Sequence, residues 1–497
     1  MATGYLDNFY ARLGIPQTAT QDEIRAAYHQ AARKFHPDHN KDRNAAEVFI
    51  QIQEAFDTLS DPLKRGKYNE ELPKDLTTPK DILINAIYSR QTLTAMDRPQ
   101  LLYVLLNILA APNEINTQPN RQPLNICLVL DTSTSMSGSR LNAVKETAIK
   151  IIRSLGQDDI LSVVTFNDRA EVIIPASRSQ NINVLEARVS IISTGGGTEI
   201  GKGLELGYQE LKLNYRPKYH NHIILITDGR TYGDEEFCME IAAQAAGEDI
   251  TIHTLGIGNE WNDDFLESLA TVTGGSCEFA QTSNAIQRFL SEKFGRIQNT
   301  FATNVTLEFE TPDMVELRYA FRFSPDTSSI PIGGSLILGD VPKQQGLSVL
   351  LEFLIRATPE EKTYFQVLDG NLRIMIPTAP IPDFSSRLTL SRPVTPDPRP
   401  EPPPQVLVRA MSRLSLYRLQ EMAQKDLKAG NVRRATARLK NLATQLLSSG
   451  ETGLAQTVML ELDNIRSSND MSEDARKQIK YGTRALVLDS EQEETQS

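Results

Sequence analysis

From Leu124 to about Phe301 the chain alternates short apolar strands with amphipathic helices, and this alternation constrains the fold more than any other feature of the sequence. Such an alternation is typical of a parallel, doubly wound α/β sheet with helices on its faces. A chain of 497 residues is too long for one hydrophobic core. We therefore expect the α/β unit to be one of several domains.

The segments on either side of the α/β unit are β-prone. Residues 82–111 are apolar, and residues 304–376 consist of alternating runs separated by Gly and Pro. These patterns predict antiparallel strands and no helix in the second segment. Because the two ends of a domain often lie close together, we expect both flanks to meet in one β-sandwich into which the α/β domain is inserted.

The two ends of the chain have helical periodicity, and a Pro-rich tract precedes the second of them. The tract is expected to be an extended spacer, with a PxxP ligand as the alternative. The apolar faces beyond it predict a small helical bundle, with a partner-binding or dimer-forming face as the alternative. The expected division is an all-α domain at 1–72, strands at 82–111, the α/β domain at 120–302, the β-sandwich at 303–390, the linker at 391–404, a C-terminal α-helical domain at 405–488 and a disordered acidic tail at 489–497.

Charge and cysteine content exclude several classes of protein. The formal net charge is −11 and the pI about 5.3, which argues against a general role in binding nucleic acid or an anionic membrane. The three cysteines are scattered, which rules out a disulfide framework and a CxxC zinc site. No segment reads as a signal peptide or a membrane span. We expect a soluble cytoplasmic protein.

The first helical zone begins with a capping box and contains a cationic stripe. Thr20 and Glu23 have the spacing of a capping box, and a second helix is expected at about 44–59. On the first helix, basic side chains recur at helical spacing and lead to the tripeptide at 36–38. The residues concerned are Arg25, Arg33, Lys34, His36, Pro37 and Asp38. From composition alone, a solvated helix face and ordinary loop capping are the alternatives.

Residues 5–72 resemble a J domain, the module of DnaJ-type cochaperones. The segments that carry the resemblance are DNFYARLGI, DEIRAAYHQAARKFHPD and AFDTLSDPLKRGKYNE. The resemblance implies that the HPD loop and the basic second helix dock on a DnaK-type chaperone and trigger its ATP hydrolysis. His36, Pro37 and Asp38 would then be the essential contacts, with Arg25, Arg33 and Lys34 as electrostatic guides. His29 and Gln30 stand where the family often has Lys or Arg.

Oxygen-bearing side chains follow the strands of the α/β unit. LNICLVLD ends at Asp131 and is followed by Ser133 and Ser135, while Thr198 follows a glycine run and Asp228 ends HIILITD. The carboxyl edge of an open α/β sheet is where ligands bind. Carboxylate and hydroxyl oxygens favour Mg²⁺ or a similar hard cation. Waters and one exchangeable ligand, such as a partner's carboxylate, would complete the coordination.

The alternative is that the two serines cap the following helix and that Asp228 begins a turn. In this order, however, DxSxS, GGGT and TDG resemble a von Willebrand factor A domain over residues 120–300. The resemblance implies a metal-ion-dependent adhesion site made by Asp131, Ser133, Ser135, Thr198 and Asp228. Thr134 departs from the family's usual small residue.

Two further patterns in this region carry weaker signals. Residues 196–202 match the GxxxxGK skeleton of a phosphate loop, but Gly203 stands where the Mg²⁺-binding hydroxyl belongs. His220 and His222 flank a strand, and a pair at this spacing is more often a strand-edge feature than a metal site. A nucleotide hydrolase that uses residues 196–202 is kept as the weakest alternative because the skeleton matches, and the histidines are not expected to form a metal site.

The expected function is that of a non-enzymatic adaptor. Its J domain would stimulate a DnaK-type chaperone, and its A domain would use Mg²⁺, with Mn²⁺ or Ca²⁺ as alternatives, to hold an unidentified protein partner or client that presents a carboxylate. The zinc-bearing CxxCxGxG repeats of the founding DnaJ are missing from this sequence. The alternative function is a metal-dependent scaffold whose J domain docks without stimulating turnover.

Overall fold

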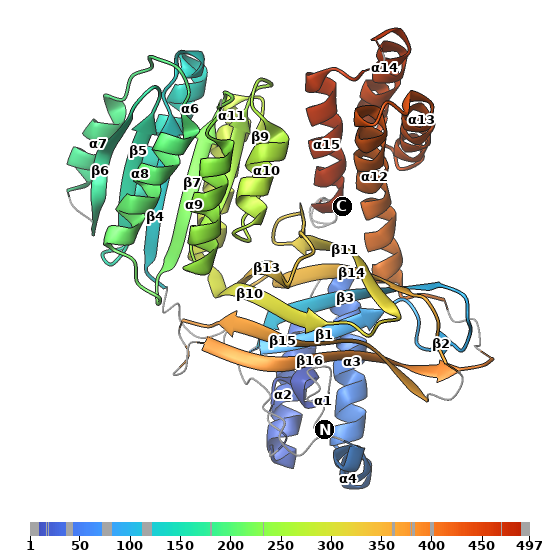
Figure 1. Cartoon of the computed structure of the whole chain (residues 1–497). Coiled ribbons are helices and arrows are strands. Elements are labelled where there is room, and N and C mark those ends of the chain that lie inside the picture. The colour runs from blue at the N-terminus through green and yellow to red at the C-terminus, as the bar shows by residue number, and fades with distance from the viewer. Residues whose placement is uncertain are drawn as a thin grey trace.

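The structure is a computed structural model. It describes residues 9–15, 17, 19–35, 43–71, 82–111, 122–178, 181–231, 233–359, 363–377, 379, 383–397, 402–468 and 470–488. Two packed β-sheets form the middle of the molecule (Figure 1). The N-terminal helices lie on one side of these sheets, and the α/β domain and the C-terminal helices lie on the other.

The N-terminal domain is a set of helices around an apolar core. The Thr20 backbone N–H donates to Glu23 Oε2 at 2.6 Å and the Glu23 N–H to Thr20 Oγ1 at 3.3 Å, so the predicted capping box is present. Its second helix packs on its third with Tyr28 stacked on Phe56. The helices are α1 (Phe9–Leu13), α2 (Gln21–Phe35), α3 (Arg43–Leu59) and α4 (Pro62–Glu71).

The α/β domain is built on a six-stranded sheet in the order β6-β5-β4-β7-β8-β9, in which β6 alone is antiparallel to its neighbour. The four inner strands are buried on both faces because helices cover both sides, whereas the edge strand β6 is partly exposed. The strands are β4 (Leu124–Asp131), β5 (Ile160–Phe166), β6 (Ala170–Arg178), β7 (His220–Thr227), β8 (Thr251–Ile257) and β9 (Cys277–Ala280); the helices are η1 (Thr134–Met136), α6 (Ser139–Ser154), α7 (Ile182–Ser190), α8 (Ile200–Leu213), α9 (Glu235–Gly247), α10 (Asp263–Thr271) and α11 (Ser283–Gln298).

The two central sheets combine strands from both sides of the α/β domain. β3 pairs with β1 and with β14, so residues 82–111 and the later β segment share one sheet. Alternate side chains of both sheets form a single hydrophobic core. The sheet orders are β1-β3-β14-β11-β12 and β13-β10-β15-β16-β2; the strands are β1 (Ile82–Tyr88), β2 (Leu93–Thr94), β3 (Gln100–Ala110), β10 (Thr300–Glu310), β11 (Val315–Ser324), β12 (Ser328–Ser329), β13 (Ser335–Pro342), β14 (Leu347–Ile355), β15 (Tyr364–Met375) and β16 (Asp383–Thr395).

The last strand continues past the predicted start of the linker at 391, so that boundary is wrong. Pro393 lies inside β16 opposite Tyr364, and the Val394 N–H donates to the Thr363 carbonyl at 2.9 Å. Since Val394 directs its N–H toward β15, the nitrogen of Pro393 faces the other side, where β2 pairs only with residues 394 and 395. A proline without a donor is tolerated at such an edge.

The C-terminal helices contact both the sheets and the α/β domain. Leu414 and Tyr417 pack against the outer face of the first sheet together with Leu105 and Phe321. Leu416, Leu439, Leu442 and Leu446 form the predicted bundle core. The helices are α12 (Gln405–Lys428), α13 (Val432–Ser448), α14 (Thr452–Ser468) and α15 (Glu473–Leu488).

Candidate functional site

The carboxyl ends of β4 and β7 bring two buried carboxylates to one edge of the α/β sheet. The strands are parallel neighbours, with Leu130 opposite Ile226, so Asp131 and Asp228 emerge side by side. Both residues are almost fully buried. At the opposite edge, Arg322 of β11 donates to the carbonyls of Gly274 at 2.8 Å and Gly275 at 2.6 Å, which tie the domain to the central sheets. The carboxylate edge therefore faces away from the sheets.

A chain of hydrogen bonds joins the predicted oxygen ligands. Ser133 Oγ lies 3.0 Å from Ser135 Oγ, and Ser135 Oγ donates to Asp228 Oδ1 at 2.6 Å. The Ser133 N–H donates to Asp131 Oδ1 at 2.7 Å, and Thr227 Oγ1 donates to Asp131 Oδ2 at 2.6 Å. The side chains of both serines thus point toward Asp228 and not toward a helix end.

The glycine run brings Thr198 to the same place. The Gly195 N–H donates to the Thr132 carbonyl at 2.8 Å, which fastens the run to the loop after β4. At Gly229, a Cβ atom would lie 2.9 Å from Thr198 Oγ1, so the absence of a side chain there lets Thr198 approach the residue after Asp228. All five predicted ligands are therefore gathered at one edge.

The two carboxylates of this edge differ in their electrostatic surroundings. Burial raises the pKa of the Asp131 carboxyl and the charge of Asp228 adds to the rise, whereas the hydrogen bonds from Ser133 and Thr227 lower it. Arg140 Nη1 donates to Asp228 Oδ2 at 2.5 Å, so the outer oxygen of this carboxylate already has a cationic partner. Its inner oxygen faces the serine hydroxyls.

The donor set fits a hard divalent cation better than a capping role. Helix α6 begins after Gly138, without a side-chain hydrogen bond at its cap, so the capping explanation for Ser133 and Ser135 fails. The site offers carboxylate and hydroxyl oxygens, which Mg²⁺ prefers. In the described part of the chain, no three His, Cys, Asp or Glu side chains gather in a metal-binding arrangement. A metal at this edge would therefore depend on the hydroxyl oxygens as well as on the two carboxylates.

The GxxxxGK segment does not form a phosphate cradle. The Gly197 N–H donates to Asp168 Oδ1 at 2.9 Å and the Gly201 N–H to Asp234 Oδ2 at 2.7 Å. Lys202 Nζ donates to the Asp168 carbonyl at 3.0 Å. Donors that a nucleotide phosphate would need are thus taken by acceptors of the chain, two of them anionic.

The second candidate surface is the basic face of α2. The side chains of Arg25 and Arg33 are exposed, and α2 packs on α3 and α1. The contact with the central sheets is made instead by α1, where Leu83 of β1 joins the core of the helical domain. The basic face therefore remains accessible. His36, Pro37 and Asp38 and the side chain of Lys34 lie outside the described residues.

Several functional contacts were missed at the sequence level. Thr227 and Arg140 hold the two carboxylates, but neither belongs to the motif by which the site was recognised. Arg230 donates to both carboxylate oxygens of Glu473 across 243 positions of sequence, a pairing for which the sequence offers no local signal. The sequence predicts His220 and His222 to lie at the edge of a strand, whereas the structure places both inside β7, where they are buried.

None of the helices in the described ranges is both long and apolar enough to cross a bilayer.

Comparison with protein families confirms the two resemblances. Residues 125–292 match the von Willebrand factor type A domain, residues 8–69 match the DnaJ domain, and residues 405–489 match a Sll0103-like, C-terminal alpha-helical domain. Over 390 residues the chain is 30% identical to the protein sll0103 of Synechocystis sp., which covers 76% of this chain and 92% of that protein.

The N-terminal domain has curated relatives of its own. It is 51% identical over 71 residues to DnaJ homolog subfamily B member 5 of Homo sapiens and 51% identical over 63 residues to the chaperone protein DnaJ of Dictyoglomus thermophilum. The matches cover 14% and 13% of this chain and 20% and 16% of those proteins. They therefore concern the J domain alone.

Two solved structures share the fold of most of the chain. A von Willebrand factor type A protein from Catenulispora acidiphila has a TM-score of 0.63 at 16% identity and covers 81% of this chain and 96% of its own. The ArnB paralog VWA2 from Sulfolobus acidocaldarius has a TM-score of 0.51 at 13% identity, with 82% and 98% covered. At these identities the likeness shows the fold.

Proposed function

We propose, from the chain's membership of the family that includes Synechocystis sll0103 and from the J domain that it carries in addition, that this protein is a non-enzymatic cochaperone adaptor. Its J domain would recruit a DnaK-type chaperone and stimulate its ATP hydrolysis. Its A domain would hold a protein partner or client in a metal-dependent manner. Such an adaptor acts in the cytoplasm, where DnaK-type chaperones work.

The observation that carries this proposal is the placement of the two candidate surfaces. The basic face of α2 is accessible because the N-terminal domain contacts the sheets through α1. The five oxygen ligands lie at the edge of the α/β domain that faces away from the sheets. The surfaces are thus on opposite sides of the central sheets (Figure 1). A chaperone and a partner could be held together without competing for one surface.

At the adhesion site, Asp131, Ser133, Ser135, Thr198 and Asp228 would hold Mg²⁺. When bound, the metal would supply a Lewis-acidic position for a carboxylate of the partner. The chain's residues prepare this position in two ways. Ser133 and Thr227 hold the two oxygens of Asp131, and Arg140 holds the outer oxygen of Asp228, which leaves the inner one toward the serines.

The central sheets support the interpretation of one β-sandwich into which the A domain is inserted. Such a body would act as a rigid spacer between the two surfaces, since the J domain shares apolar contacts with Leu83 and Leu109. Joining two binding modules raises the effective concentration of the chaperone near the held partner. Here the packing of both domains on the central sheets, and not a flexible linker, would set the distance and orientation between the chaperone and the partner.

The proposed action of the J domain on a chaperone can be tested by removing positive charges from α2. The double variant Arg25→Gln/Arg33→Gln should reduce stimulation of a DnaK-type ATPase about tenfold at low salt, because electrostatic docking depends on these charges. Arg433→Gln/Arg434→Gln, which removes two exposed charges from α13, is the matched control and should stimulate like the wild type. Equal stimulation by all three proteins would contradict the assignment of α2.

The proposed binding of Mg²⁺ by the A domain can be tested by calorimetry. Asp131→Ala should abolish Mg²⁺ binding, and with it Mg²⁺-dependent partner capture, while the J-domain activity persists. Asp158→Ala is the control, because it removes the same charge from an exposed side chain of the α/β domain whose partner is Arg178 and which is not among the five ligands. Mg²⁺ binding by Asp131→Ala as tight as that of the wild type would overturn the site.

A further inference from the structure

The loop that carries Asp228 is tied to the last helix of the chain. Arg230 follows Asp228 by two residues, and its guanidinium donates from Nη2 to both oxygens of Glu473. The same side chain donates from Nε to the Glu260 carbonyl at 2.9 Å. Glu473 begins α15, so the amino end of this helix lies beside the candidate metal site.

A second series of contacts connects α15 with the carboxylate of Asp228. Lys477 Nζ donates to the carbonyls of Trp261, at 2.6 Å, and Asn259, and Trp261 Nε1 donates to the Gly258 carbonyl at 2.7 Å. A Cβ atom on Gly258 would lie 2.8 Å from Arg140 Nη2. Arg140 in turn holds Asp228. The loop after β7, which carries Asp228, and the loop after β8 therefore both contact α15.

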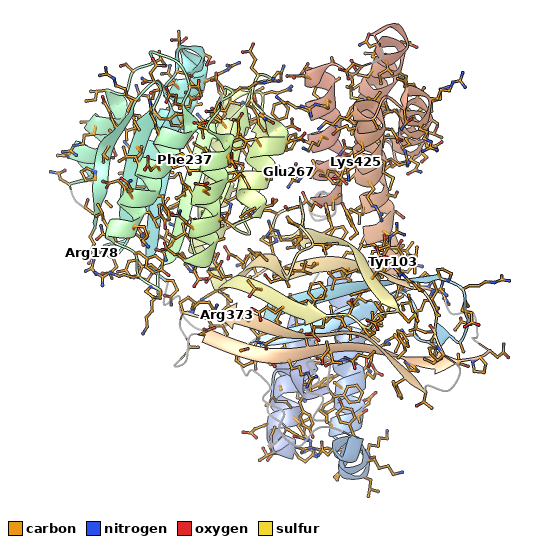
Figure 2. All side chains as sticks on the ribbon, viewed as in Figure 1. Tyr103, Arg178, Phe237, Glu267, Arg373 and Lys425 are labelled. Carbon is orange, nitrogen blue, oxygen red and sulfur yellow. The ribbon has the colours of Figure 1, made fainter. Side chains whose placement is uncertain are left out.

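The rest of α15 is fixed on the α/β domain by buried ion pairs. Lys480 Nζ lies 2.9 Å from Asp263 Oδ2 and 2.7 Å from Glu267 Oε2, and Arg484 lies 3.1 Å from Glu267. Burial acts to raise the pKa of the Glu267 carboxyl, but the charges of Lys480 and Arg484 prevail and lower it. Figure 2 shows Glu267 on the side of the α/β domain that faces the C-terminal helices. Helix α15 is therefore held in a fixed position on the α/β domain, beside the loops that follow β7 and β8.

We propose that α15 positions the adhesion site, with Glu473 and Arg230 as the positioning residues that hold the Asp228 loop in its metal-binding conformation. The inference rests on the proposed metal function and adds its regulation. A loop that is already ordered loses less entropy when a ligand binds, so docking of the C-terminal helical domain would raise the metal affinity. By linkage, metal binding would stabilise that docking to the same extent.

The test is Mg²⁺ binding by the full chain, measured by calorimetry with Mg²⁺ alone as the probe. Glu473→Gln and Arg230→Gln should each weaken binding about fivefold, which is the scale of one partly exposed ion pair. The double variant should be no weaker than either single variant, because the two changes remove one interaction. Glu473→Asp should recover part of the affinity.

Asp474→Asn is the matched control. Asp474 is the next residue of α15 and accepts hydrogen bonds from Gln281 at 3.3 Å and Gln478 at 3.0 Å, not from the Asp228 loop. Its loss removes the same charge as Glu473→Gln and should leave the affinity within twofold of the wild type. If these charges acted only by direct Coulomb interaction with the metal and not by positioning the loop, Arg230→Gln would strengthen Mg²⁺ binding, because it removes a positive charge near the metal.

The outcomes separate the two proposals. A wild-type chain that binds no Mg²⁺ contradicts the proposed metal function, and the inference falls with it. A wild-type chain that binds Mg²⁺ while Glu473→Gln matches Asp474→Asn overturns the inference alone. Tighter binding by Arg230→Gln also overturns it.

Discussion

The N-terminal helices and α15, the last helix of the chain, are held on their neighbours by different kinds of contact. The N-terminal helices share an apolar contact in which Leu83 and Leu109 of the first sheet meet their core. The C-terminal helix α15 is attached by buried charges, among them Asp263, Glu267 and Lys480. An apolar contact needs no particular partner geometry, whereas a buried ion pair tolerates little displacement. The difference fits an N-terminal domain that presents a binding face and a C-terminal domain that fixes one.

The largest effect is expected where the charged attachment is broken. Asp263→Ala removes the buried carboxylate that pairs with Arg476 and leaves Lys480 with Glu267 as its buried partner, and it should cost about 3–5 kcal/mol of unfolding free energy. Urea unfolding followed by fluorescence reports it directly, because the single tryptophan, Trp261, lies at this junction. Lys428→Gln, which breaks the exposed pair with Asp264, is the control and should cost less than 1 kcal/mol. Similar losses in the two variants would contradict the comparison.

The contribution that the junction between the α/β domain and the sheets makes to folding stability should depend on pH. Burial lowers the pKa of His220 to about 4 and also lowers the pKa values of His222 and His253, beside Lys293 and Asp326. The unfolded chain therefore binds more protons between pH 6.5 and 4, and stability should fall as the pH falls. For His220 alone the loss is about 3 kcal/mol.

Buried carboxyls at this junction act in the opposite direction, since burial raises the pKa values of Asp249 and Glu278. Burial also raises the pKa of Asp340 to about 6, which adds stability as the pH falls below 6. The three histidines begin to destabilise the folded chain at a higher pH than that at which the carboxyls begin to stabilise it, so melting temperatures measured from pH 7.5 to 4.5 should decline. The decline should be shallower in His220→Phe and unchanged in His29→Gln, whose side chain is exposed. A decline that His220→Phe leaves unaltered would refute the role of this histidine.

A smaller effect is expected at the apolar attachment. Leu83→Ala should cost about 2–3 kcal/mol, since Leu83 is almost fully buried between the sheet and the N-terminal helices. Amide exchange should then accelerate in α1 and α3 and stay unchanged in α10 and α15. Leu63→Ala, at a side chain that is 81% exposed, is the control. Faster exchange in α15 would show that the two attachments are not independent.

The parts of the molecule that the sequence predicted are those with local signals. Capping chemistry predicted the start of α2, and the spacing of DxSxS with later strand ends predicted which oxygens would meet. The rest depends on contacts between distant segments. Leu414 and Leu416 lie on different sides of α12, and Leu416 packs in the bundle whereas Leu414 packs on the first sheet, a division that periodicity alone does not predict. The pairing of Arg230 with Glu473 likewise arises from the packing of domains, which periodicity does not encode.

The proposed function requires that the N-terminal domain stimulate a DnaK-type chaperone independently of the proposed adhesion site. Steady-state ATP hydrolysis by such a chaperone, from the same organism, tests it with the wild-type chain, His36→Gln and Asp131→Ala. We expect stimulation by the wild type and by Asp131→Ala, and none by His36→Gln. Equal stimulation by the wild type and His36→Gln, or no stimulation by the wild type, would contradict the proposed function.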